Sequence, residues 1–189
     1  MQIHKIVNSV FESNTYILSS ILCDYCWLID IGDIESVMNV IGSKIIRGVF
    51  ITHSHYDHIY GLPALLKKFP ECQIFTSSYG KEGLASDKYN LSKYHGDSII
   101  IDNGNICVLE DGDIIDLFDS IKLTAMWTPG HDRSCMTYYT NEAVFTGDSY
   151  IPGYSVVVTF PRSSKTDSLF SLKKIEELLI KKKVYPGHK

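Results

Sequence analysis

The segment THSHYDH at residues 52–58 carries most of the information in this chain. It places three histidines and an aspartate immediately after IIRGVFI at 45–51, which is apolar enough to form a buried strand. A loop that leaves the end of a buried strand carries its side chains toward a shared point. Imidazole nitrogens and carboxylate oxygens are ligands that zinc accepts in proteins. The segment therefore predicts a metal site at the end of a core strand.

The spacing within this segment predicts two neighbouring metal positions. His53 and His55 are two residues apart, so both imidazoles can face one metal ion from an extended turn. Asp57 and His58 come at the start of the helix that is predicted next, so we expect them to face an adjacent position.

Three further residues at strand ends are expected to join the site. His131 and His188 each follow Pro-Gly, in TPGH and YPGH, and Asp148 ends a predicted strand in VFTGD. Because such ends meet along one edge of a sandwich, we expect these side chains to converge with the first segment. The two remaining histidines, His4 and His95, are expected to have no metal role.

Local patterns elsewhere predict two similar blocks, each rich in strands and ending in a helix. Hydrophobic periodicity predicts helices at 34–43, 61–69 and 167–182, with a short helix and a surface excursion at 81–97. Hairpin turns are expected at Asn103-Gly104 and Asp111-Gly112. The last helix is expected to pack through one apolar stripe: Leu169, Leu172, Ile175, Leu178 and Leu179.

The predicted strands fill most of the remaining chain: 3–7, 14–20, 26–32, 45–52, 73–77, 98–102, 106–110, 113–118, 121–127, 134–140, 143–148 and 184–189. This order of elements predicts an α+β fold in which two sheets pack face to face with helices outside. We expect a four-layer αββα sandwich formed by a single domain over residues 1–189.

Composition excludes several classes of function. The formal net charge of -4 gives no reason to expect nucleic acid or an anionic membrane as a partner. The apolar runs are too short to span a bilayer, and residues 1–14 do not resemble a signal peptide, so we expect a cytoplasmic protein. The five cysteines are expected to be free thiols, with Cys135 packed in a core strand and the Cys23–Cys26 pair at a hairpin turn.

The motifs as a set resemble those of the metallo-β-lactamase superfamily, and within it they are closer to the glyoxalase II-like hydrolases than to true β-lactamases. The resemblance rests on THSHYDH, TPGH, FTGDS and YPGH, together with NTYIL at 14–18 and LIDIG at 28–32. It implies the αββα fold and a role for Asp30 in orienting the ligands. It also implies a division of ligands, in which the first metal is held by His53, His55 and His131, the second by Asp57, His58 and His188, and Asp148 bridges both.

This resemblance implies a dinuclear zinc hydrolase that cleaves a small ester, thioester or lactone. Two zinc ions per chain, with iron or manganese as alternatives, would lower the pKa of a shared water so that a bridging hydroxide attacks the carbonyl. Asp57 and Asp148 would act in catalysis as well as in binding, Asp57 by orienting the nucleophile or handling its proton. The expected partner is a small-molecule substrate.

Substrate contacts are expected from the loop at 149–166, which follows Asp148. Tyr150 or Tyr154 can donate a hydrogen bond to an oxyanion, and Arg162 and Lys165 can bind a carboxylate or phosphate. The motifs leave one main alternative open, an oxidoreductase similar to the mononuclear iron persulfide dioxygenases of this fold. Diiron flavoproteins fit less well, because they carry an acidic ligand where His55 stands.

Overall fold

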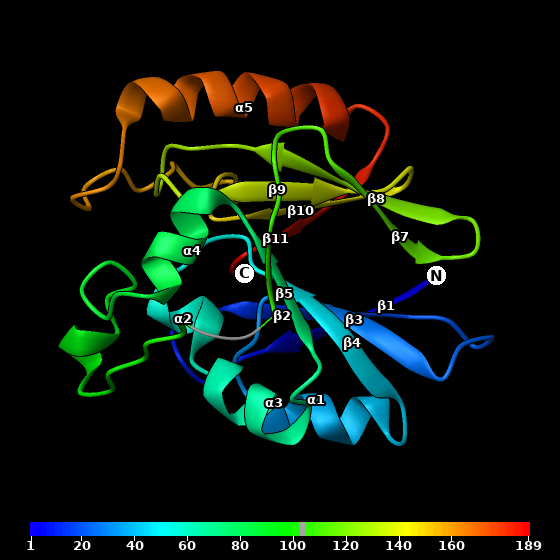
Figure 1. Cartoon of the computed structure of the whole chain (residues 1–189). Coiled ribbons are helices and arrows are strands. Elements are labelled where there is room, and N and C mark those ends of the chain that lie inside the picture. Colours follow the sequence, from blue (N-terminus) through cyan, green and yellow to red (C-terminus); the bar gives the residue numbers. More distant parts are fainter. Residues whose placement is uncertain (103–104) are drawn as a thin grey trace.

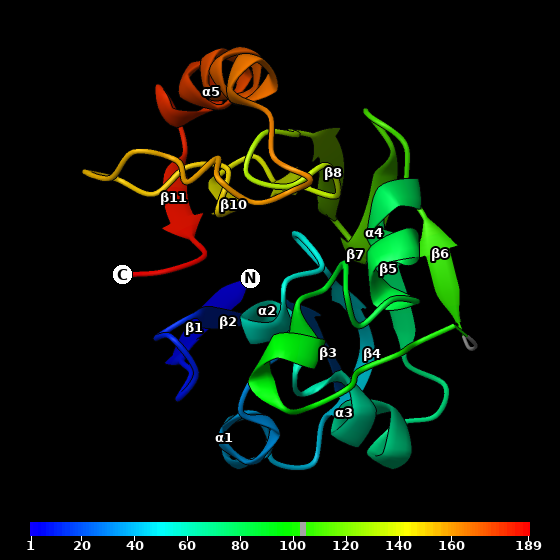
Figure 2. The ribbon, with the colours of Figure 1, turned by 90° about the vertical axis from the view of Figure 1, so that its left-hand side faces the viewer.

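A computed structural model describes residues 1–102 and 105–189, so the turn predicted at Asn103-Gly104 lies outside the described residues. Two β-sheets are stacked on one another, and helices cover their outer faces (Figures 1 and 2). The first sheet has the strand order β1-β2-β3-β4-β5-β6 and the second has the order β11-β10-β9-β8-β7. The predicted αββα sandwich is therefore confirmed.

The strands of the first sheet are β1 (Gln2–Val7), β2 (Asn14–Ser19), β3 (Tyr25–Ile29), β4 (Ile45–Phe50), β5 (Gln73–Thr76) and β6 (Ile106–Val108). Those of the second are β7 (Ile114–Phe118), β8 (Ile121–Trp127), β9 (Met136–Tyr139), β10 (Ala143–Gly147) and β11 (Lys183–Pro186). The helices are α1 (Ile34–Ile41), α2 (Tyr56–Ile59), α3 (Leu62–Lys68), α4 (Ser78–Leu84), the 3-10 turn η1 (Ser92–His95) and α5 (Lys165–Leu179).

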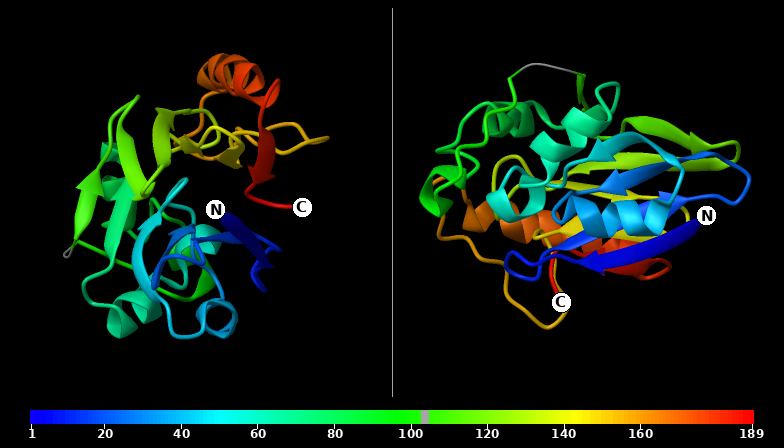
Figure 3. Two further views of the ribbon diagram at one scale, coloured as in Figure 1. Left: turned by 90° about the vertical axis from the view of Figure 1, so that its right-hand side faces the viewer. Right: turned by 90° about the horizontal axis from the view of Figure 1, so that it is seen from below.

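Strand direction brings distant motifs to one edge. In the first sheet β3, β4, β5 and β6 run parallel, so the segments that follow β3 and β4 leave from the same end of the sheet. In the second sheet β10 and β11 are also parallel, and they carry the segments that end at Asp148 and His188. The strands of both sheets run alongside one another when the molecule is seen from below (Figure 3).

Two apolar layers hold the sandwich together. The side chains of β2 alternate between them: Ile17 packs with the layer under the helices, whereas Tyr16 and Leu18 face the space between the sheets. Because both faces of β2 are covered, all of its residues are buried. Between the sheets, the rings of Phe50 and Phe75 stack with their centroids 4.6 Å apart.

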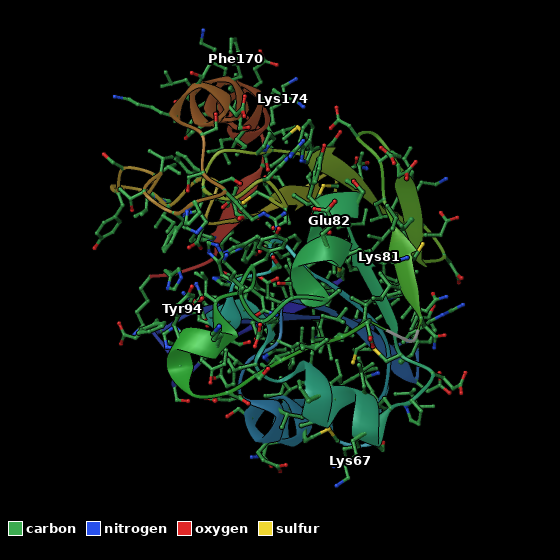
Figure 4. All side chains as sticks on the ribbon, turned by 60° about the vertical axis from the view of Figure 1, so that its left-hand side comes forward. Lys67, Lys81, Glu82, Tyr94, Phe170 and Lys174 are labelled. Carbon is green, nitrogen blue, oxygen red and sulfur yellow. The ribbon has the colours of Figure 1, made fainter. Side chains whose placement is uncertain are left out.

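Helix α5 covers the second sheet through small residues, and the predicted stripe is wrong at Leu169. Ser168, Ser171 and Ile175 form its buried face, while Leu169 is 56% exposed. Phe170 also lies on the outer surface of the helix (Figure 4). The reason is the close approach of the backbone at Gly130, where an added Cβ would lie 2.5 Å from the Cα of Ser168. The helix thereby fixes the loop that carries His131.

The strand predicted at 98–102 and the hairpin predicted at Asp111-Gly112 are both wrong. Residues 98–102 form no strand, because residues 84–92 take their backbone hydrogen bonds. Asn90 donates to the Ile99 carbonyl, the Ile99 amide donates to Ser92 Oγ, and the Ile101 amide donates to the Leu84 carbonyl. Asp111 and Gly112 do form a tight turn, but it joins β6 of one sheet to β7 of the other and is therefore not a hairpin. Within the described ranges, no helix combines the length and apolar character needed to cross a membrane.

We predict that Gly130→Ala destabilises the protein by roughly 3 kcal/mol. The φ angle of Gly130 is 152°, so alanine would add backbone strain as well as the overlap with Ser168. The matched control is Gly112→Ala, where φ is 95° but nothing lies within 4 Å of the added Cβ, and we expect a loss of about 1 kcal/mol. Urea unfolding measures both, and equal losses would refute the proposed close contact.

Candidate metal centre

Seven buried or half-buried side chains from four segments of the chain meet at one edge of the sandwich. Their donor atoms form three overlapping groups in which all atoms lie within 4.8 Å of one another. The groups are His53, His55 and His131; His53, His58 and Asp148; and Asp57, His58 and His188. All seven residues that the sequence predicts as ligands are thus brought together, and the metal assignment itself stays a prediction.

The first group consists of three imidazoles that face one point. His53 leaves the end of β4 and is fully buried, and its Nε2 has no hydrogen-bond partner. His55 Nδ1 lies 3.0 Å from His131 Nε2. Burial and the neighbouring His58, His55 and His131 hold the pKa of His53 well below its usual range. A neutral imidazole with a free lone pair is the form that binds a divalent cation.

The group of Asp57, His58 and His188, called the second group from here on, is more acidic and more open. His58 Nε2 lies 3.3 Å from His188 Nε2 and 3.3 Å from Asp57 Oδ2, and Asp57 Oδ2 lies 3.2 Å from His188 Nε2. Burial raises the pKa of Asp57, but the contacts with His58 and His188 outweigh it and hold that pKa well below its usual range. The side chain of His188 is 22% exposed, so this group faces the outside.

Asp148 lies between the two groups. Its Oδ2 is 3.6 Å from His131 Nε2 and 3.4 Å from His188 Nε2, and its Oδ1 is 3.5 Å from His58 Nε2. Oδ1 is buried and has no hydrogen-bond partner. Burying a polar atom without a partner is costly. The orphaned atoms of Asp148 and His53, surrounded by nitrogen and oxygen donors only, fit a pair of divalent cations.

The ring nitrogens that face away from the centre have partners of their own. His58 Nδ1 is 2.8 Å from Asp30 Oδ2, His131 Nδ1 is 2.9 Å from the Val157 carbonyl, and His188 Nδ1 is 3.0 Å from the Phe11 carbonyl. Such contacts fix the orientation of a ligating imidazole and its tautomer. The role that the resemblance implied for Asp30 agrees with this geometry.

The Pro-Gly before His188 has a steric reason. An added Cβ at Gly187 would overlap Asp148 Oδ1, so only glycine lets β11 approach the centre this closely. The N-terminal loop holds the same segment from the other side, because the Asn14 amide donates to the Gly187 carbonyl at 2.7 Å. Phe11, whose carbonyl meets His188, has a left-handed φ of 51°. A strained backbone of this kind persists where surrounding contacts determine it.

Asp132 is a site residue that the sequence reasoning missed. Its Oδ2 lies 3.7 Å from His55 Nε2 and 3.6 Å from Arg162 Nε, and its Oδ1 accepts hydrogen bonds from the amide and hydroxyl of Ser134. Burial raises the pKa of Asp132, but His55 and Ser134 lower it to about 2. An ionised carboxylate therefore stands behind His55. The signal was the carboxylate that directly follows His131 in the sequence.

The residues predicted to contact substrate are placed differently from one another. Tyr154 is 70% exposed and lines a cavity of about 260 Å³ together with His131, Asp148 and His188. Tyr150 is half-buried and does not line that cavity. Arg162 borders a second cavity, but its Nη2 donates to the Tyr79 carbonyl at 3.0 Å. Lys165 is exposed at the start of α5 and lines neither cavity.

Cys135 packs in the core, as the sequence predicts. Its side chain is buried, its sulfur accepts a hydrogen bond from the Asp132 amide, and burial raises the pKa of the thiol. His4, on β1, is exposed. His95 stacks on the ring of Tyr56 with centroids 4.7 Å apart, and neither histidine belongs to a donor group within the described part of the chain.

Comparison with known proteins places these features in a family. The sequence model described as the Metallo-beta-lactamase superfamily matches residues 40–188. The BLEG-1 B3 metallo-beta-lactamase has a similar structure, with a TM-score of 0.85 and 20% identity over 100% of this chain and 92% of that one. TTHA1623 in a di-iron-bound form has a TM-score of 0.81 and 21% identity, over 98% of this chain and 92% of that one. ETHE1 from Myxococcus xanthus has a TM-score of 0.78 and 21% identity, over 100% of this chain and 76% of that one. At these identities the likeness to the solved structures shows a shared fold.

We predict that Asp148→Ala abolishes tight binding of both metal ions, whereas His188→Ala loses mainly one. Asp148 reaches donors of both groups, and His188 belongs to one group only. Equilibrium dialysis against zinc followed by elemental analysis gives the number of ions per chain. His4→Ala is the matched control and should retain both ions. Two tightly bound ions in Asp148→Ala would show that this carboxylate does not bridge.

We predict that Asp132→Asn weakens zinc binding at the first group by roughly 10- to 100-fold, the usual effect of removing a partner behind a ligating histidine. Asparagine keeps the size and the hydrogen bonds to Ser134 but removes the charge beside His55. Titration against a chelator of known affinity measures the change. The control is Asp111→Asn at the protein surface, and an Asp132→Asn affinity equal to that of this control would count against the role.

Proposed function

Because this chain belongs to the metallo-beta-lactamase superfamily, we propose that it is a dinuclear metal hydrolase of a small ester, thioester or lactone. Water is the nucleophile, and zinc is the metal that the nitrogen and oxygen donors suit best. The substrate is a small molecule, which reaches the centre through the cavities that border it.

The observation that carries this proposal is the position of Asp148. One of its oxygens lies within 3.6 Å of donors in both groups, and the other is buried without a partner. A carboxylate in this position supports two adjacent cations rather than one. When bound, a pair of divalent ions supplies Lewis acidity and lowers the pKa of a shared water.

The protein's own residues orient the reactants. Asp57 presents Oδ2 at the open side of the centre, where it can accept a hydrogen bond from the attacking water and hold its proton. Phe160 packs its ring edge-on against His55 and His131, with centroids 4.9 and 5.4 Å away, and excludes bulk water from that side. Of the two proposed oxyanion donors, Tyr154 is better placed than Tyr150, because it borders the same cavity as Asp148.

A mononuclear iron persulfide dioxygenase is the second candidate. The observation that favours it is the composition of the first group, whose three imidazoles can hold one ion without the second group. TTHA1623, which shares this fold, is known in a di-iron-bound form, so iron is compatible with the fold. In this alternative Asp57, His58 and His188 would not hold a metal ion.

Metal content and activity together decide between the two candidates. We predict two zinc ions per chain in protein purified without added metal, and hydrolysis of at least one member of a panel of esters, thioesters and lactones. A chelator should abolish this activity, and added zinc should restore it. One iron ion per chain, together with oxygen consumption on addition of a persulfide, would replace the hydrolase by the dioxygenase.

A further inference from the structure

A cavity of about 400 Å³ adjoins the first donor group, on the side of His55. It lies between two segments that are far apart in the sequence, the residues that follow α4 and the residues that precede α5. Figure 4 shows Tyr94, from η1, on the side of the molecule where the loop before α5 also lies. The cavity is large enough for a small ligand group.

The walls of this cavity are mainly apolar: Tyr89, Leu91, Tyr94, Phe160 and Pro161. Leu91 has a φ of 68°, which a leucine rarely adopts. The turn around it is held by neighbours, because the Ser92 amide donates to Asn90 Oδ1 and the Asn90 side chain donates to the Ile99 carbonyl. These hydrogen bonds hold Leu91 in its left-handed conformation, at a position where its side chain borders the cavity.

Of the charged side chains at the cavity, Asp132 and Arg162 lie beside each other, and Lys88 is exposed to solvent. The guanidinium of Arg162 is bonded to the Tyr79 carbonyl, lies beside Asp132 and stacks over the ring of Tyr89 at 4.8 Å. Its Nη1 is directed toward α4, 3.6 Å from where a Cβ on Gly83 would stand. Arg162 and Asp132 thus neutralise each other. This arrangement disfavours the carboxylate or phosphate that the sequence predicts Arg162 to bind.

We propose that this cavity is an acyl pocket, which binds an uncharged alkyl or aryl chain attached to the scissile carbonyl. A carbonyl at the centre has Phe160 beside it, and this ring borders both the imidazoles and the cavity. The chain can therefore continue from the centre into the pocket along the ring of Phe160. The preferred substrates are esters or thioesters of apolar acids longer than acetate. This preference rests on the proposed function, because the reaction itself is the proposed hydrolysis.

Alkyl hydroxamic acids test the pocket without requiring turnover, because they bind metal centres and differ only in chain length. The zinc-loaded protein is titrated with acetohydroxamate and hexanohydroxamate by calorimetry. Burying a methylene is worth up to about 4-fold in affinity, so we expect hexanohydroxamate to bind at least about 10-fold more tightly. The quantity compared between variants is the ratio of the two affinities, so that a general change at the centre cancels.

Leu91→Asn introduces a residue that tolerates the left-handed backbone but makes the cavity wall polar. The ratio of the hexanohydroxamate and acetohydroxamate affinities should then fall below about 3-fold. Tyr94→Ser repeats the test at a 66% exposed side chain whose loss does not threaten folding. Ile151→Asn, in the 260 Å³ cavity on the other side, is the matched control and should keep the wild-type ratio.

A ratio near one in the wild type would overturn the acyl pocket, as would a ratio unchanged in both pocket variants or lost only in Ile151→Asn. Activity is a separate readout. If no ester or thioester is hydrolysed while the chain-length dependence follows the pocket variants, the hydrolase fails and the acyl pocket stands.

Discussion

Asp30 accepts three hydrogen bonds at the end of β3, and the donor groups depend on them. The amide and hydroxyl of Thr52 each donate at 2.7 Å, and His58 Nδ1 lies at 2.8 Å. One buried carboxylate thus fixes the residue before His53 and the ring of His58 at the same time. Asp30 has a left-handed φ of 55°, a conformation that aspartate tolerates better than most residues. The backbone conformation and these hydrogen bonds together hold the carboxylate beside Thr52 and His58.

The sequence allowed much of this arrangement to be predicted, because the ligands follow strands whose patterns are local. The ligands come directly after strands or a few residues beyond them: the segment after β4, the two Pro-Gly-His motifs and Asp148. Strand ends in a sandwich share an edge. Residues 98–102 have the composition of a strand, yet loop side chains take their hydrogen bonds. The contact between α5 and Gly130 was also not predictable, since it depends on how closely two distant segments approach.

The pairing of Arg162 with Asp132 could not be predicted from the sequence. Arg162 is far from Asp132 in the chain, so their pairing at 3.6 Å depends on the fold. Without that pairing, an arginine near the centre predicts an anionic substrate. With it, the arginine supports the carboxylate behind His55, and the walls of the neighbouring cavity are mainly apolar. The same contact therefore bears on metal binding and on the choice of substrate.

We propose that two metal ions share Asp148 at this edge of the sandwich. Crystals of the zinc-loaded protein, measured at the zinc absorption edge, test it most directly. We expect two anomalous peaks, each at a bonding distance of about 2.0–2.2 Å from an Asp148 oxygen. One peak should lie among His53, His55 and His131, and the other among Asp57, His58 and His188. A single peak, or a second peak that Asp148 does not touch, would contradict it.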